Sequence, residues 1–201
     1  MIKIGITGSI AAGKTTASKI LSYKRGPLFS ADKVIKTIYR NNNFKKLLTR
    51  EFSINKKSNL KNLLKEKILQ DKKNINKLEK IIHPMVRKEM KKFSIINKRK
   101  KKLFYEIPLL IENKLMKYFD IIIFIKAKKK VRLKRFKFKG GDEKLFNILN
   151  NKQLPDLKKI KLSDHVVVNE KNFSILKKNL LGIINLYAWS ISRYRNNWFI
   201  I

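Results

Sequence analysis

Residues 5–16, GITGSIAAGKTT, have the residue types and spacing in this chain that are best suited to chemistry. Gly8, Gly13, Lys14 and Thr15 match a phosphate-binding loop, in which four residues separate two glycines and the second glycine precedes lysine and then serine or threonine. Glycine adopts backbone conformations closed to other residues, so consecutive N–H groups can surround phosphate oxygens. The pattern predicts a nucleoside triphosphate site, but it does not separate a kinase from an ATPase or a GTPase.

Each residue of this loop has an expected task. We expect the backbone from Ser9 to Thr15 and the Lys14 ammonium to hold the β- and γ-phosphates of ATP, and the Thr15 hydroxyl to bind Mg²⁺. A helix that begins at Lys14 would add its positive N-terminal end. The predicted nucleotide-binding residues are Gly8, Ser9, Ile10, Ala11, Ala12, Gly13, Lys14, Thr15 and Thr16, and the predicted metal ligand is Thr15.

Alternating strands and helices are predicted to position the loop. The isoleucines of MIKIGIT predict a buried strand before it, and the spacing of Ala17, Ile20 and Leu21 predicts a helix behind it that ends near Arg25. Strands that alternate with helical segments indicate an α/β fold with a parallel sheet covered on both faces. Four further strands are predicted within residues 26–32, 102–112, 120–127 and 165–169.

Two helical segments accompany this predicted core. Residues 33–97 have helix-like spacing with few strand signals, and residues 128–162 are basic and helical around GGD at 140–142. Small-metabolite kinases insert a substrate cover and a mobile lid into a nucleotide-binding core, and the sequence lacks the base-reading and switch motifs of GTPases. We therefore predict a single kinase domain. It consists of a core at about 1–32, 100–130 and 160–201, a substrate-binding insert at 33–97 and a lid at 131–158.

The charge of the chain raises the question of nucleic-acid binding. Fifty Lys and Arg against 14 Asp and Glu give a net charge of +36, and polycations gain affinity for nucleic acids by displacing counterions. The lysines run through every segment, together with many isoleucines and asparagines, and all three have A/T-rich codons. We therefore favour a nucleotide bias of the genome over a nucleic-acid function.

Other features of composition exclude further classes. With no cysteine and two histidines, the chain has no thiol chemistry, and a histidine-rich metal centre is not expected. The sequence has no run of about 18 uncharged apolar residues, and MIKIGI does not begin like a signal peptide. We expect a cytoplasmic protein without a membrane partner, with Trp189, Tyr194 and Trp198 packed on the core.

Four further motifs resemble those of the dephospho-coenzyme A kinases, in order and spacing. They are SADKVI at 30–35, IIHPMVRKEM at 81–90, IPLLIEN at 107–113 and QLPDLKKIKLSDHVVVNE at 153–170, so the resemblance covers residues 1 to about 170. It implies a three-layer fold like that of nucleoside monophosphate kinases, with a parallel five-stranded sheet, a helical substrate insert and a lid. It also implies transfer of the ATP γ-phosphoryl group to the ribose 3′-hydroxyl of dephospho-CoA. A monomer is favoured.

The resemblance assigns roles that the residues alone leave open. Asp32 is the candidate to orient the 3′-hydroxyl and accept its proton, although aspartate also suits the N-cap of a helix starting at Lys33. The predicted substrate-binding residues are Asp32, His83, Pro108, Leu109 and Glu112. A lone histidine is more often structural, and Glu112 either contacts the substrate or neutralises a basic residue. Glu106 either helps to hold Mg²⁺-bound water or forms a salt bridge. Asn169 either reads the adenine or forms a turn.

The predicted lid departs from the family pattern. The segment RLKRFKFKGGDEK keeps Arg135, but Lys139 stands where the family commonly has a second arginine, and one residue is missing. Lysine lacks the two-pronged guanidinium fork, so either Lys139 suffices or Arg135 or Arg132 reaches the phosphates. The predicted catalytic residues are Lys14, Asp32, Arg135 and Lys139. The alternatives are another small-metabolite or nucleotide kinase, or a basic nucleic-acid-binding protein with a vestigial loop.

Overall fold

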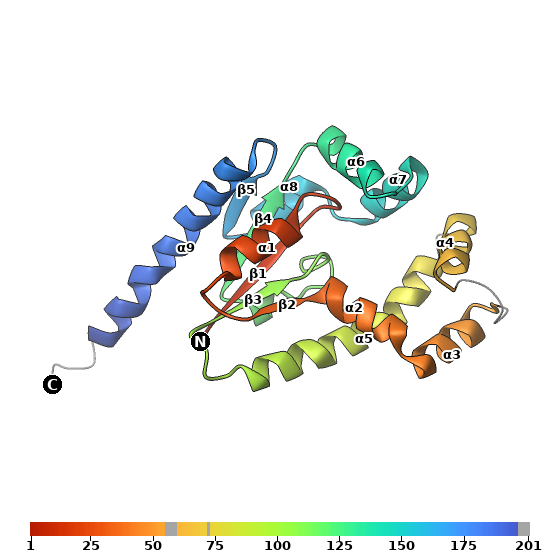
Figure 1. Cartoon of the computed structure of the whole chain (residues 1–201), viewed down its shortest axis with the longest axis horizontal. Helices are drawn as coiled ribbons and strands as arrows, with labels where there is room; N and C mark the ends of the chain where they lie inside the picture. Colours follow the sequence, from red (N-terminus) through yellow and green to blue (C-terminus); the bar gives the residue numbers. More distant parts are fainter. Residues whose placement is uncertain (55–59, 72, 197–201) are drawn as a thin grey trace. The chain divides into compact units, whose positions relative to one another are not determined.

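The computed structural model describes residues 1–54, 60–71 and 73–196, and the chain forms two compact units. Unit 1 joins residues 1–28 to the chain from Arg99 onward, and unit 2 comprises Phe29–Lys98. Figure 1 shows the chain coloured along the sequence. Four of the five strands lie in unit 1, and the strand at residues 28–30 spans the boundary between the units. Unit 2 is therefore an insertion between two parts of the chain that build one sheet.

A five-stranded sheet of order β2-β3-β1-β4-β5 positions the phosphate loop. Ile6 of β1 is in register with Glu106 of β3 and with Ile123 of β4, which is in register with His165 of β5, and each of these pairings is parallel. The predicted parallel five-stranded sheet is thus confirmed. The strands are β1 (Ile2–Gly8), β2 (Leu28–Ser30), β3 (Lys102–Glu106), β4 (Ile121–Lys126) and β5 (His165–Val168).

The third strand is shorter than the sequence predicts. We expected a strand within 102–112, but β3 ends at Glu106 and residues 108–114 form turns. Pro108 has no N–H to donate to a neighbouring strand, so the ladder cannot continue through it. The chain instead turns back, and a short 3₁₀ helix (Met116–Tyr118) leads into β4.

Helices cover the two faces of the sheet. Because side chains alternate along a strand, Ile4, Ile6 and Ile123 share one face, and their core cluster includes Leu21 of α1 and Leu180 of α9. Figure 1 shows α9 running beside α1. The opposite face includes Tyr105, whose ring packs edge-on against Phe119. The helices of unit 1 are α1 (Lys14–Ser22), α6 (Lys129–Phe138), α7 (Glu143–Lys152), α8 (Asp156–Lys161) and α9 (Phe173–Asn196).

Unit 2 is built from helices around its own core. Phe44 and Leu48 of α3 are almost fully buried in a cluster that includes Leu64 of α4 and Ile82 of α5. Asn41 caps α3, because its side-chain oxygen accepts hydrogen bonds from the backbone N–H groups of Asn43 and Phe44. The helices are α2 (Ala31–Arg40), α3 (Asn42–Glu51), α4 (Leu60–Gln70) and α5 (Lys73–Ile96).

Two features of the long helices bear on the sequence predictions. α5 continues through Pro84 without a turn, although a proline inside a helix removes one backbone hydrogen bond. In α9 the side chains from residue 188 onward, including those of Trp189, Tyr194 and Trp198, lie outside the described residues. Among the residues that are described, no helix combines the length and the apolar character needed to cross a membrane.

Gly26 tests how tightly the chain packs against β3. A Cβ at Gly26 would lie 2.2 Å from the backbone oxygen of Lys102 and 3.4 Å from the Phe104 ring. Gly26→Ala should therefore lower the free energy of unfolding by about 1–3 kcal/mol, the scale of overpacking. Gly182→Ala, in α9 with no atom within 4 Å of its Cβ, is the matched control and should raise it by up to about 1 kcal/mol. Urea unfolding curves measure both, and a Gly26→Ala protein as stable as the unchanged one would contradict the packing.

Candidate phosphate-loop site

The phosphate loop (Gly8–Thr15) joins β1 to α1 at the carboxyl end of the sheet. Gly13 has φ +98°, in the left-handed region that favours glycine, and a Cβ there would lie 2.2 Å from Nδ2 of Asn169. A Cβ at Gly8 would lie 2.5 Å from the backbone oxygen of Ile125. Both glycines are therefore required by close approach of the loop to its neighbours.

Lys14 and Thr15 occupy the first turn of α1. The Lys14 ammonium donates hydrogen bonds of 3.0 Å to the backbone oxygens of both Gly8 and Ser9, and the residue is 8% exposed. Thr15 Oγ1 donates to Oε1 of Glu106 at 2.5 Å, and Glu106 is buried at the end of β3. The loop thus presents an ammonium group next to a hydroxyl and a carboxylate at the N-terminal end of a helix, where anions are stabilised.

Two arginines of α6 reach the loop from the segment predicted as the lid. Arg132 is buried, and its guanidinium donates to the Asn150 side-chain oxygen at 2.8 Å and to the backbone oxygen of Ile10 at 3.4 Å. Half-buried Arg135 donates to the backbone oxygen of Ala12 at 3.5 Å. Burial lowers the pKa of Arg132, and nearby Asp156 acts in the opposite direction. Lys139, by contrast, is exposed at the C-cap of α6.

The last part of the predicted lid and the residue after β5 also contact the loop. The Gln153 side-chain oxygen accepts a 2.9 Å hydrogen bond from the backbone N–H of Ile10. The Asn169 side chain, 7% exposed just after β5, donates to the backbone oxygen of Ala12 at 2.8 Å. Asn169 was predicted either to read adenine or to form a turn, and the structure adds a contact that holds the loop.

A buried group of charges lies against Ser9. The Lys159 side chain is fully buried, and its ammonium donates to Ser9 Oγ at 2.7 Å. Its nitrogen is 3.5 Å from Oε1 of Glu112 and 3.7 Å from Oδ1 of Asp156. Ser9 Oγ in turn donates to Asp156 at 2.5 Å. Burial lowers the pKa of Lys159, whereas Glu112 and Asp156 act to raise it.

Sequence reasoning gave no role to Lys159, Asp156 or Gln153. All three lie in the motif QLPDLKKIKLSD. The motif indicated that this segment matters, but it did not indicate which of its residues contact the loop. Lys158 and Lys161, which flank Lys159 in α8, are exposed and chemically identical to it. Only the packing of α8 against the sheet distinguishes the buried lysine from its neighbours.

The predicted substrate residues divide between the two units. Pro108, Leu109 and Glu112 belong to unit 1, where the backbone oxygen of Pro108 accepts a 3.1 Å hydrogen bond from Thr7 Oγ1. Asp32 and His83 belong to unit 2. Asp32 is exposed in the first turn of α2 and is not its N-cap, which is Ser30, because the helix begins two residues earlier than expected. His83 is half-buried within α5.

Similarity to solved structures gives the class of protein. A deoxyadenosine kinase from M. mycoides has a TM-score of 0.57 at 19% identity, covering 92% of this chain and 100% of that chain. A dephospho-CoA kinase from Campylobacter jejuni has a TM-score of 0.63 at 25% identity, covering 91% and 95%. The fold and the loop together define a phosphate-loop kinase.

Sequence comparison then gives the family. The family model for dephospho-CoA kinase matches residues 2–174. A dephospho-CoA kinase of Bartonella quintana is 32% identical over 186 residues, which cover 90% of this chain and 95% of that protein. One from Zymomonas mobilis is 31% identical over 197 residues, covering 96% and 100%. The chain belongs to the dephospho-CoA kinase family.

The tight approach of Gly13 to Asn169 can be tested by substitution. Gly13→Ala must displace the Asn169 side chain and its hydrogen bond to Ala12, so we expect at least a tenfold weaker affinity for ATP, about 1.4 kcal/mol. Gly140→Ala is the matched control, since Gly140 also has a left-handed φ, +79°, but has no atom within 4 Å of its Cβ. Calorimetric titration with ATP measures both. Equal affinities in the two variants would show that the loop tolerates a side chain at Gly13.

Proposed function

We propose that this protein phosphorylates the ribose 3′-hydroxyl of dephospho-CoA with ATP, giving coenzyme A and ADP. The observation that supports this most directly is a complete phosphate loop, with Lys14 and Thr15 at the start of α1, in a chain of the dephospho-CoA kinase family. Phosphoryl transfer depends on positioning and charge neutralisation more than on covalent chemistry. We propose that the residues of the site supply both.

The loop is the proposed site of the ATP phosphates. The backbone N–H groups from Ser9 to Thr15 would surround phosphate oxygens, and the Lys14 ammonium would exchange its backbone partners for the β- and γ-phosphates. Residues Ile10 to Thr16 are proposed to contact the nucleotide as part of this loop and of the first turn of α1. Arg135, which donates to the Ala12 backbone oxygen, is proposed as a lid cation for the phosphates, and exposed Lys139 would neutralise phosphate charge only as the lid closes.

Thr15 and Glu106 fit a magnesium ion. Hydroxyl and carboxylate oxygens are ligands that Mg²⁺ accepts, and these two lie 2.5 Å apart at the start of α1. Thr15 would hold the ion directly and Glu106 through ion-bound water. When bound, Mg²⁺ neutralises charge on the phosphates.

Asp32 is the proposed group that orients the acceptor hydroxyl and takes its proton. It is exposed, and it lies two residues after the carboxyl end of β2, at the edge of a parallel sheet where ligands gather. A carboxylate in the first turn of a helix is stabilised in its ionised form, which is the form that accepts a proton. His83, Pro108, Leu109 and Glu112 are proposed to contact the substrate. Glu112 Oε2 is buried without a hydrogen-bond partner among the described residues, so it can accept a bond from a hydroxyl.

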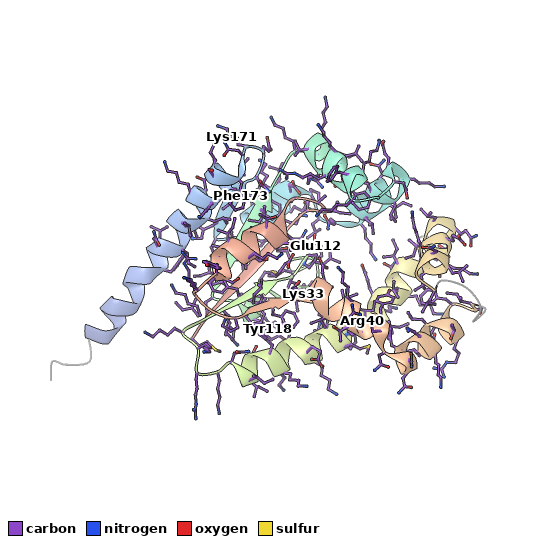
Figure 2. All side chains as sticks on the ribbon, in the orientation of Figure 1. Lys33, Arg40, Glu112, Tyr118, Lys171 and Phe173 are labelled. Carbon is purple, nitrogen blue, oxygen red and sulfur yellow. The ribbon has the colours of Figure 1, made fainter. Side chains whose placement is uncertain are left out.

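The proposed acceptor is a small molecule and not a nucleic acid. Figure 2 shows nitrogen-tipped side chains along the helices of both units, rather than on a single helix or strand. Such a distribution suits a compositional origin of the net charge of +36 better than a polyanion-binding face. We propose that the protein acts in the cytoplasm as a monomer.

The decisive experiment is a transfer assay with ATP, Mg²⁺ and dephospho-CoA, run in parallel with AMP, CMP and shikimate as acceptors. We expect phosphorylation of dephospho-CoA alone, and loss of activity when Mg²⁺ is removed by a chelator. Lys14→Ala should lower turnover at least about a hundredfold, because it removes the charge closest to the transferred group. Transfer to another acceptor would keep the kinase class and overturn the substrate.

Asp32→Asn tests the proposed general base. We expect turnover to fall at least about a hundredfold with ATP affinity unchanged, since the amide cannot accept the proton. Asp71→Asn is the control, because Asp71 is an exposed aspartate of the same unit whose carboxylate accepts a 2.8 Å hydrogen bond from Lys73 N–H at the start of α5. Steady-state rates with dephospho-CoA separate the two variants. Normal turnover in Asp32→Asn would leave Asp32 with a structural role in α2.

A further inference from the structure

Lys159 is the most deeply buried charged group beside the phosphate loop. The chain has 50 basic residues, and the side chain of this lysine is fully buried. Its ammonium lies 5.4 Å from the centre of the Phe124 ring. Removing an ammonium from water is costly unless it is paired and hydrogen-bonded. The partners that offset this cost are Ser9 of the loop, Glu112 of the turn after β3, and Asp156 of the same helix.

We propose that Lys159 is a positioning residue of the phosphate loop, and that it balances the charges of Glu112 and Asp156 beneath the site of the nucleotide phosphates. This inference rests on the proposed function only in that the loop binds ATP. Lys159 does not touch the transferred group. It acts on the loop through Ser9, whose hydroxyl it holds.

The hydrogen bonds of Ser9 explain how a buried lysine sets the loop. Ser9 Oγ accepts from Lys159 and donates to Asp156, so the side chain is fixed in both directions. The backbone oxygen of the same Ser9 accepts from Lys14, the residue expected to contact the β- and γ-phosphates. A shift of Ser9 would therefore move the resting position of the Lys14 ammonium.

The charges give Lys159 a second effect on the same site. Glu112 and Asp156 are two carboxylates that share the Lys159 ammonium. Arg132, which interacts electrostatically with Asp156, supplies a second positive charge near them. Without Lys159 the two carboxylates would outnumber the remaining cation. The uncompensated negative charge would lie next to Ser9, where phosphates are expected, and would repel them in a medium that screens poorly.

Figure 2 labels Glu112, the carboxylate that pairs with Lys159. Glu112 Oε1 pairs with Lys159 and also accepts from the backbone N–H of Leu154 at 3.3 Å. It therefore joins the turn after β3 to α8 and, through Lys159, to the phosphate loop. Neutralising Glu112 should remove the repulsion that appears once Lys159 is lost.

The test compares two substitutions with opposite expectations. Lys159→Met keeps the apolar stem and removes the charge, and we expect its affinity for ATP to fall at least tenfold. Lys159→Arg keeps the charge in a larger side chain, and we expect its affinity to stay within about threefold. A role in packing alone predicts the reverse order, because methionine fills the space and arginine overfills it. Lys158→Met is the control of equal charge at an exposed neighbour and should bind like the unchanged protein.

Calorimetric titration of ATP and Mg²⁺ into the full chain measures these affinities without an acceptor, and urea unfolding confirms that each variant is folded. The double variant Lys159→Met, Glu112→Gln should recover at least half of the lost binding free energy. A folded Lys159→Met with unchanged affinity would overturn the proposal. If this variant does not fold, a folded Lys159→Arg that binds more than tenfold more weakly would overturn it too. Failure of the proposed function has a different signature, namely ATP binding by the unchanged protein without phosphorylation of dephospho-CoA.

Discussion

The close approach of the phosphate loop to its neighbours is the constraint on which the site depends. The chain leaves β1 next to the Ile125 carbonyl and enters α1 against the Asn169 side chain, so neither Gly8 nor Gly13 has room for a side chain. This path leaves the backbone oxygens of Gly8 and Ser9 on one side, where Lys14 binds them. The Ile10 N–H and the Ile10 and Ala12 oxygens bond to side chains from the later part of unit 1, namely Gln153, Arg132, Arg135 and Asn169.

Acidic residues are scarce in this chain, and their placement shows where charge must be balanced. Three of the 14, Glu106, Glu112 and Asp156, contact the phosphate loop or the lysine buried beneath it. Most of the other lysines that the structure describes are exposed to water, where like charges are well screened. A compositional pressure towards lysine can therefore act on the surface, but the buried charges around the loop still require carboxylates as partners.

The sequence predicted the loop and the order of the elements well, because each depends on local chemistry. The glycine spacing specifies the turn from β1 to α1, and the isoleucine-rich segments specify buried parallel strands. The ends of elements were less predictable. β3 stops before Pro108, and α2 begins at Ala31, which removes Asp32 from the N-cap. Each of these boundaries depends on one residue, and periodicity does not locate it.

Buried polar partners were the least predictable part of the site. Lys159 is one of four lysines within residues 152–161 whose sequence context does not differ in any way that indicates burial. Its partners Ser9 and Glu112 lie 150 and 47 positions before it in the chain. Their meeting depends on how the sheet brings distant segments together, which a sequence pattern does not encode. Arg132 was distinguishable from Arg135 only after the packing of α6 was known.

The way unit 2 is joined to unit 1 has a consequence for the evolution of the sequence. Residues 29–98 leave and re-enter the core through β2 and β3, which are neighbours in the sheet, and the Pro27 oxygen accepts a 3.0 Å hydrogen bond from Phe104 N–H at this junction. An insertion whose ends are adjacent can be lengthened, shortened or replaced without rerouting the rest of the chain. The helical unit has a hydrophobic cluster of its own, so its residues can diverge while those of the phosphate loop stay fixed. Changes to the helical unit are therefore confined to one contiguous stretch of the gene.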